Sequence, residues 1–164
     1  MVRYMNYRTR TRSAAAFSLI ELVIVVVIIA IIAAIAIPRM SRGAAGAADS
    51  ALSGNLRILR SAIELYATEH TGQFPPAASV VDALTKYSNE QGTSFQTTKD
   101  ATHVFGPYLR AIPPLPVNCP RKGATGIATA DAAGIGWIYD PVAGSIRANT
   151  TTEVDDKGIT YSSY

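Results

Sequence analysis

The chain has 164 residues and carries 15 Lys and Arg against 12 Asp and Glu. Four of the arginines lie within the first twelve residues, so eleven basic residues face twelve acidic ones in the rest of the chain. The positive net charge therefore belongs to the N-terminus and does not indicate nucleic-acid binding, which would need a Lys/Arg cluster on an exported face. The single cysteine, Cys119, excludes an intramolecular disulfide.

An apolar run follows the basic segment. Residues 22–37 are only Leu, Val, Ile and Ala, and the stretch counted from Phe17 is long enough for a helix of about 20 residues to cross a bilayer. Arginines upstream of such a span keep that flank in the cytoplasm. They are Arg3, Arg8, Arg10 and Arg12. The sequence predicts that the chain after Ile37 is exported.

Two ordinary interpretations of this stretch leave Glu21 unexplained. One is a secretory signal peptide, with residues 34–36 (Ala-Ile-Ala) as the cleavage site. The other is a plain single-pass anchor. A carboxylate beside a membrane span is costly and is usually paired or functional, so Glu21 favours a third interpretation.

The sequence Phe17-Ser18-Leu19-Ile20-Glu21-Leu22 follows Ala16, and the apolar run ends in Ala36-Ile37-Pro38. This arrangement resembles the N-terminal signal of type IV prepilins and type II secretion pseudopilins. Those proteins have a short basic leader, a small residue at the cut, a Phe-Thr/Ser-Leu-Ile-Glu-Leu core and a helix ending in Ala-Ile-Pro. Ala16 stands where the family usually has Gly.

The resemblance implies how this segment is used. A membrane prepilin peptidase is expected to cut between Ala16 and Phe17 and to methylate the new amine of Phe17. Glu21 is expected to pair with the N-terminal amine of a neighbouring subunit during filament assembly. Four residues of helix, about 6 Å of rise, separate the two groups, so an axial offset between neighbours can bring them together.

The helix is predicted to continue beyond the membrane over residues 38–71. Pro38 should kink the helix without ending it, because its ring removes one backbone hydrogen bond. The stretch that follows contains Gly43, Gly46 and Gly54. This stretch fits either a helix that is less stable in its middle or a segment that packs closely between subunits.

The second half of this helix is amphipathic. Side chains on one face recur at steps of three and four, which predicts a buried stripe. The members of the stripe are Leu52, Leu56, Leu59, Ile63, Tyr66 and, at its end, His70. His70 is interpreted as a residue at the end of the helix whose ring nitrogens have hydrogen-bond partners within the protein. Gly72 marks the helix stop.

Residues 72–164 predict a small α+β head. A short helix is expected over 79–87 with Ser79 as N-cap, then a polar loop over 89–102 and a Pro-rich strap over 106–116. Two runs around a Gly-containing turn predict a hairpin over 136–149, and a further strand is expected at 126–129 or 159–161. The predicted architecture is a long N-terminal helix packed on a small antiparallel sheet.

No nucleophile–base, phosphate-loop or metal-binding motif is apparent in the sequence, and His103 stands alone on a polar loop. Asp155 and Asp156 could supply oxygen ligands for calcium, which major pseudopilins hold in a C-terminal loop, although an acidic solvated tail is the simpler interpretation. No other cofactor is expected.

The sequence thus predicts a structural subunit rather than an enzyme: a pseudopilin of a type II secretion-type filament. Its expected parts are a leader (1–16), a membrane and filament-core helix (17–37), the continuation of that helix (38–71) and an exported head (72–164). Expected partners are prepilin peptidase, further copies of the chain, other pseudopilins and an inner-membrane assembly platform. The alternatives are a type IV pilin for adhesion, motility or DNA uptake, and a membrane-anchored exported binding domain that does not polymerise. In each case the bacterial inner membrane is the expected location.

Overall fold

The computed structural model describes residues 17–155 and 157–164, with only the backbone described for residues 38–42. The expected cut-site residue Ala16 and the calcium candidate Asp156 lie outside the described residues. The chain divides into two compact units, Met1–Met40 and Ser41–Tyr164, and each is considered by itself below.

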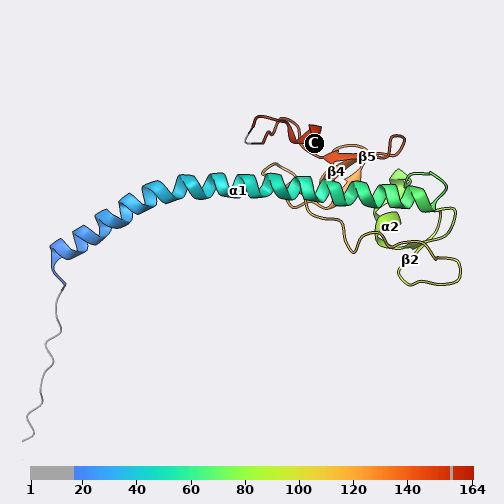
Figure 1. Cartoon of the computed structure of the whole chain (residues 1–164), viewed down its shortest axis with the longest axis horizontal. Coiled ribbons are helices and arrows are strands. Elements are labelled where there is room, and N and C mark those ends of the chain that lie inside the picture. Colours follow the sequence, from blue (N-terminus) through green and yellow to red (C-terminus); the bar gives the residue numbers. More distant parts are fainter. Residues whose placement is uncertain (1–16, 156) are drawn as a thin grey trace, which may run out of the picture. The chain divides into compact units, whose positions relative to one another are not determined.

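Helix α1 (Leu19–Glu69) contributes to both units and is the longest element in Figure 1. Its helical backbone continues through Pro38, as the sequence predicts. The helix ends where Thr71 and Gly72 take positive φ angles of 56° and 82° and the Gly72 N–H donates to the Ala67 carbonyl at 2.7 Å. This six-to-one bond is typical of a Schellman ending, although here Thr71 rather than glycine occupies the first left-handed position.

A short helical segment follows the extended residues 73–76. It consists of a 3₁₀ turn, η1 (Ala77–Ser79), and helix α2 (Val80–Thr85). Ser79 is the N-cap of α2 as expected, but its side chain makes no capping hydrogen bond. The Lys86 ammonium pairs with the Asp82 carboxylate at 2.8 Å. The helix ends at Thr85, two residues before the predicted end at Tyr87.

Two small sheets complete the head. Strands β1 (Tyr87–Ser88) and β2 (Phe95–Gln96) form an antiparallel pair. The sequence predicted neither strand: β2 lies in the predicted loop 89–102, and β1 begins at Tyr87, the predicted end of the short helix. Strands β4 (Ile135–Asp140) and β5 (Ser145–Ala148) form the predicted hairpin, with Trp137 opposite Ala148 and Asp140 opposite Ser145. The α+β class is therefore confirmed.

The third strand of the larger sheet differs from the prediction in its direction. Strand β3 (Gly126–Ala128) lies at one of the two predicted places, but it pairs parallel to β4, so the sheet is mixed rather than antiparallel. The register shifts between Gly126 and Ile127, and the Gly126 N–H donates to the Gly134 carbonyl at 3.0 Å. Apolar alternation locates a strand but carries no information about its direction. The other position predicted for a strand, residues 159–161, does not form one. Thr160 makes an isolated bridge with Val154, and Tyr161 begins the 3₁₀ turn η2 (Tyr161–Ser163).

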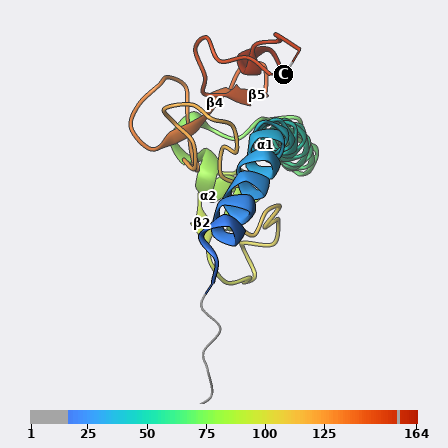
Figure 2. The same ribbon diagram turned by 90° about the vertical axis from the view of Figure 1, so that its left-hand side faces the viewer.

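The core of the head lies between the second half of α1, helix α2 and the larger sheet. In Figure 2, α2 and β4 lie on the same side of α1. All the apolar positions of the predicted stripe on α1 are buried, and so is its terminal histidine. Trp137 and Tyr139 from β4 are buried against them, and each donates a hydrogen bond to a proline carbonyl: Trp137 to Pro113 at 2.8 Å and Tyr139 to Pro75 at 3.0 Å. The Pro-rich strap is thus fixed to the sheet.

Candidate functional site

The first turn of α1 is organised by Glu21. The Ser18 backbone N–H donates to Glu21 Oε2 at 2.9 Å, and the Leu22 N–H makes the first helical bond to the Ser18 carbonyl at 3.2 Å. Ser18 and Glu21 therefore form one half of a capping box, in which an acidic side chain three residues into the helix satisfies a free donor at its start. The carboxylate also lies at the positive end of the helix dipole.

The apolar run behind Glu21 presents its side chains outward. Residues Leu19–Ile37 form a candidate membrane span by length and composition, and none of that window is buried within the structure. Phe17, at the expected mature N-terminus, is 85% exposed. A helix that is apolar on every side needs lipid or other helices around it. Glu21 is the one ionisable side chain in this span.

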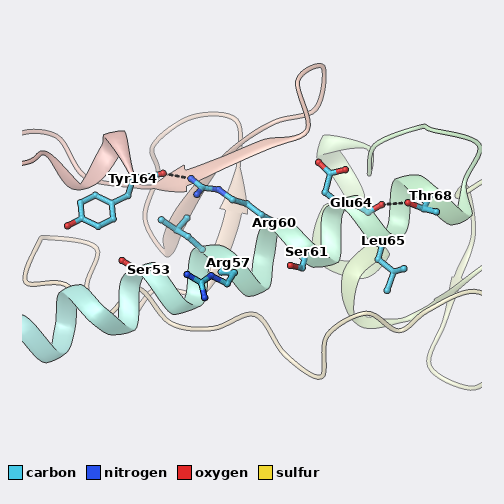
Figure 3. A pocket seen from close by; sticks show the side chains of 9 residues that line it. Ser53, Arg57, Arg60, Ser61, Glu64, Leu65, Thr68 and Tyr164 are labelled. Atoms are coloured by element: carbon cyan, nitrogen blue, oxygen red, sulfur yellow. Dashed lines mark hydrogen bonds between the residues drawn. The ribbon is translucent and has the colours of Figure 1, made fainter.

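The second half of α1 and Tyr164 line a groove (Figure 3). Its volume is about 640 Å³, and its lining includes Arg57, Arg60, Glu64 and Tyr164. The Arg60 guanidinium donates to the Ile146 carbonyl at 3.3 Å and to the Tyr164 carbonyl, as the dashed line in Figure 3 shows. Arg60 therefore connects α1 to β5 and to the last residue of the chain.

The calcium candidate Asp155 is occupied by its own loop. Its Oδ1 accepts hydrogen bonds from the Lys157 and Ile159 backbone N–H groups at 2.9 and 2.7 Å, and its Oδ2 accepts one from the Tyr164 hydroxyl. The Tyr164 bond is the largest cause that lowers the pKa of this carboxyl. Within residues 17–155 and 157–164, no three His, Cys, Asp or Glu side chains gather at metal-binding distance.

The two histidines of the head are both hydrogen-bonded. His70 lies between the Tyr66 carbonyl and the Ser88 hydroxyl, at 2.9 and 3.0 Å, as expected for a satisfied helix-end residue. His103 is not alone on its loop as the sequence suggested: it contacts Asp100 and Ser94 at 2.9 Å each. The sequence contains no signal for this contact, because Ser94 is brought there by the unexpected β1–β2 pair.

Cys119 is partly buried and is not part of any disulfide. Burial is the largest cause that raises the pKa of its thiol. A thiol with a raised pKa has less thiolate at neutral pH and is a poor nucleophile. Cys119 therefore behaves as a packing residue.

Comparison with known families bears on the N-terminus. Residues 11–37 match the family model described as the prokaryotic N-terminal methylation motif. The chain carries a prepilin-type N-terminal signal. This signal is typical of type IV pilin-like proteins and pseudopilins, and the apolar start of α1 fits a membrane-anchored protein of that type. No curated protein and no solved structure gives a significant match to the chain.

Proposed function

We propose that the chain is a structural subunit, a pseudopilin, of a type II secretion-type filament. The observation that carries this proposal is the prepilin-type signal over residues 11–37, with Glu21 as the one carboxylate at the head of an exposed apolar helix. In the proposed pathway, prepilin peptidase cuts between Ala16 and Phe17 and methylates Phe17 in the inner membrane. The head stays on the exported side throughout, and the helices of neighbouring copies then form the filament core.

Glu21 has two partners in this pathway. In the free subunit its carboxylate caps its own helix through the Ser18 N–H. In the filament it pairs with the N-terminal amine of a neighbour, because two lone charges in a medium of low dielectric constant are far more costly than a pair. Assembly therefore exchanges a hydrogen bond within one chain for an ion pair between chains.

The secretion role is preferred to an adhesive or motile type IV pilus for one reason. Many type IV pilins close a C-terminal loop with a disulfide, whereas this chain has a single cysteine. Deleting the gene and measuring protein export against surface piliation distinguishes the two roles. Loss of export with unchanged piliation is expected.

The variant Glu21→Gln tests assembly most sharply, because its amide oxygen can still accept the Ser18 N–H while its charge is lost. We expect this variant to insert into the membrane, to begin at methylated Phe17 and to keep a folded head, yet to form no filaments. The measurements are the N-terminal residue and mass of the mature protein and filament counts by electron microscopy. A plain membrane anchor would be indifferent to the change, and a mature chain that begins at Met1 or Ile37 would contradict the proposal.

A further inference from the structure

Ser94, His103 and Asp100 form a hydrogen-bonded series in the head. The Ser94 hydroxyl lies 2.9 Å from His103 Nε2, and His103 Nδ1 lies 2.9 Å from both carboxylate oxygens of Asp100. A hydroxyl, an imidazole and a carboxylate in this order are the groups that activate a serine for nucleophilic attack. The three side chains lie within ten residues of sequence, on the segments that follow β1 and β2.

The contacts determine which nitrogen of His103 carries the proton. Asp100 is an acceptor, so Nδ1 must donate to it, and the lone pair of Nε2 is left to accept the Ser94 hydroxyl proton. Hydrogen bonds from the backbone and ring of His103 lower the pKa of Asp100, which keeps this carboxylate ionised at neutral pH. The imidazole is thus held in the tautomer that can act as a base toward Ser94.

The backbone around these residues is fixed by further hydrogen bonds. The Asn89 side-chain oxygen accepts the Thr93 and Ser94 N–H groups at 2.9 and 3.0 Å. Phe105, two residues after His103, exchanges backbone hydrogen bonds with Ser88 at 3.0 and 3.3 Å. The hydroxyl and the imidazole are therefore positioned by two separate anchors.

Exposure also suits a reactive hydroxyl. Ser94 is exposed to solvent, whereas His103 is 7% exposed. A reagent can reach the hydroxyl, while the ring that takes its proton is largely shielded from water.

We propose that Ser94 is an activated nucleophile that accepts an acyl group from activated carboxylic esters, with His103 as its base and Asp100 as a positioning residue. The Ser94 oxygen attacks the ester carbonyl carbon and its proton passes to His103 Nε2. The ester C–O bond then breaks, the alkoxide or phenoxide leaves, and the acyl group remains on Ser94. The proton on His103 returns to solvent.

Hydrolysis of the acyl group is expected to be slow. A donor aimed at the oxyanion would speed both acylation and hydrolysis, and losing one such donor costs about 10²–10³ in rate. The Ser94 N–H is already donated to Asn89. Acylation still proceeds because the activated ester has a good leaving group, whereas the serine ester that forms has a poor one. Ser94 is therefore a site of covalent modification.

Two other serines of the chain are matched comparisons. Ser88 contacts a histidine, His70, at 3.0 Å, but it is completely buried. Ser50 is exposed, but its hydroxyl donates to the Gly46 carbonyl and has no histidine partner. Ser94 combines the exposure of Ser50 with the histidine partner of Ser88.

The experiment treats the full chain in detergent with p-nitrophenyl acetate and maps acetylated residues by peptide mass spectrometry over time. Because general-base assistance contributes about 10²–10⁴ in rate, we expect Ser94 to be acetylated roughly 10²-fold faster than Ser50, with Ser88 unmodified. The variant His103→Gln should lower the rate at Ser94 to that at Ser50. Asp100→Asn should lower it at least about tenfold, because the preferred tautomer is lost.

A loss of structure in the loop is controlled in two ways. The variant Lys99→Gln changes an exposed side chain directly before Asp100 that makes no hydrogen bond or ion pair among the described residues, so the Ser94 rate should change little. The pH dependence is the second control. Asp100 is the charged side chain that contacts the ring among the described residues, and the decline in rate at acid pH should disappear in His103→Gln. Equal acetylation of Ser94 and Ser50, or an unchanged Ser94 rate in His103→Gln, would overturn the proposal.

Discussion

At the scale of single residues, side-chain hydrogen bonds hold segments together that lie far apart in the sequence. The Asp131 carboxylate is one centre of such contacts: it accepts two hydrogen bonds from Arg121, at 2.8 and 2.9 Å, and one from the Asn149 amide at 2.7 Å. The same amide donates to the Ile135 carbonyl at 2.8 Å. Asp131 therefore connects the loops on both sides of β3 to the end of β5.

These contacts predict a pH dependence. Hydrogen bonds from Arg121 and Asn149 lower the pKa of Asp131 from 3.8 to about 2. A carboxyl whose pKa is lower in the folded state contributes stability above its unfolded pKa and loses it as the pH falls through its folded pKa. The free energy of unfolding of the head should therefore decrease between about pH 4 and pH 2.

The variant Asp131→Asn isolates this contribution. It should be less stable than the wild type at neutral pH and show a shallower decrease over the same pH range, measured by urea unfolding monitored through Trp137 fluorescence. The exposed variant Asp140→Asn is less suitable as a control, because Asp140 accepts the Val142 and Ala143 N–H groups. Glu90→Gln serves better, since Glu90 makes no hydrogen bond or ion pair among the described residues. An identical pH slope in Asp131→Asn and the wild type would contradict this account.

At the scale of elements, α1 combines two different surfaces. Its first part is apolar on all sides, whereas its second part buries one stripe and exposes Ile58 and Leu65, which are 52% and 50% exposed. Between these parts lies the glycine-containing stretch. The positions of Gly43, Gly46 and Gly54 have open space where a side chain would begin, so contacts within the subunit do not require glycine there.

This observation predicts opposite effects for two glycine substitutions. Gly54→Ala should stabilise the head by about 1 kcal/mol, because alanine is the better helix former and nothing obstructs its methyl group. Gly92→Ala should destabilise it, because Gly92 has a φ of 63° and a methyl group there would lie 2.1 Å from the Tyr66 hydroxyl. Urea unfolding of both variants gives the two free energies.

The variant Gly54→Ala also distinguishes the two interpretations of the glycine-containing stretch. If Gly54→Ala stabilises the subunit and filaments form as before, the stretch is only a helix with a weak middle. If it stabilises the subunit but lowers filament yield, close packing between subunits requires the glycine. A destabilising Gly54→Ala would contradict the open space found at this position.

At the scale of the whole molecule, the prepilin-type signal and the core of the head belong to different parts of the chain. The signal occupies residues 11–37, whereas the core consists of residues within Ser41–Tyr164. Leu59 is completely buried in that core, while its neighbour Ile58 is half exposed. Processing and head stability should therefore respond to different mutations.

Leu59→Ala tests this separation. Truncating a buried leucine costs about 2–5 kcal/mol, so the head should unfold at a clearly lower urea concentration. The matched variant Ile58→Ala on the exposed side should change stability by only about 0.5 kcal/mol. Both variants should still begin at methylated Phe17 in N-terminal analysis. Loss of processing in Leu59→Ala alone would show that the peptidase depends on a folded head.

The sequence by itself determined the features that depend on local chemistry. A basic flank, one carboxylate and an uninterrupted apolar run specify the prepilin-type signal and the candidate span, because length and polarity alone decide membrane insertion. The stripe from Leu52 to His70 and the hairpin β4–β5 were likewise predictable, since their periods appear directly in the order of residues.

Only the tertiary structure decided the features that depend on contacts across the chain. The direction of β3 follows from its pairing with β4, and β2 forms because β1 supplies its partner; neither strand pattern encodes its neighbour. The assembly of Ser94, His103 and Asp100 depends on that β1–β2 pair. A side chain's chemistry can be read from its type, but its partners are fixed only when distant backbone segments pack together.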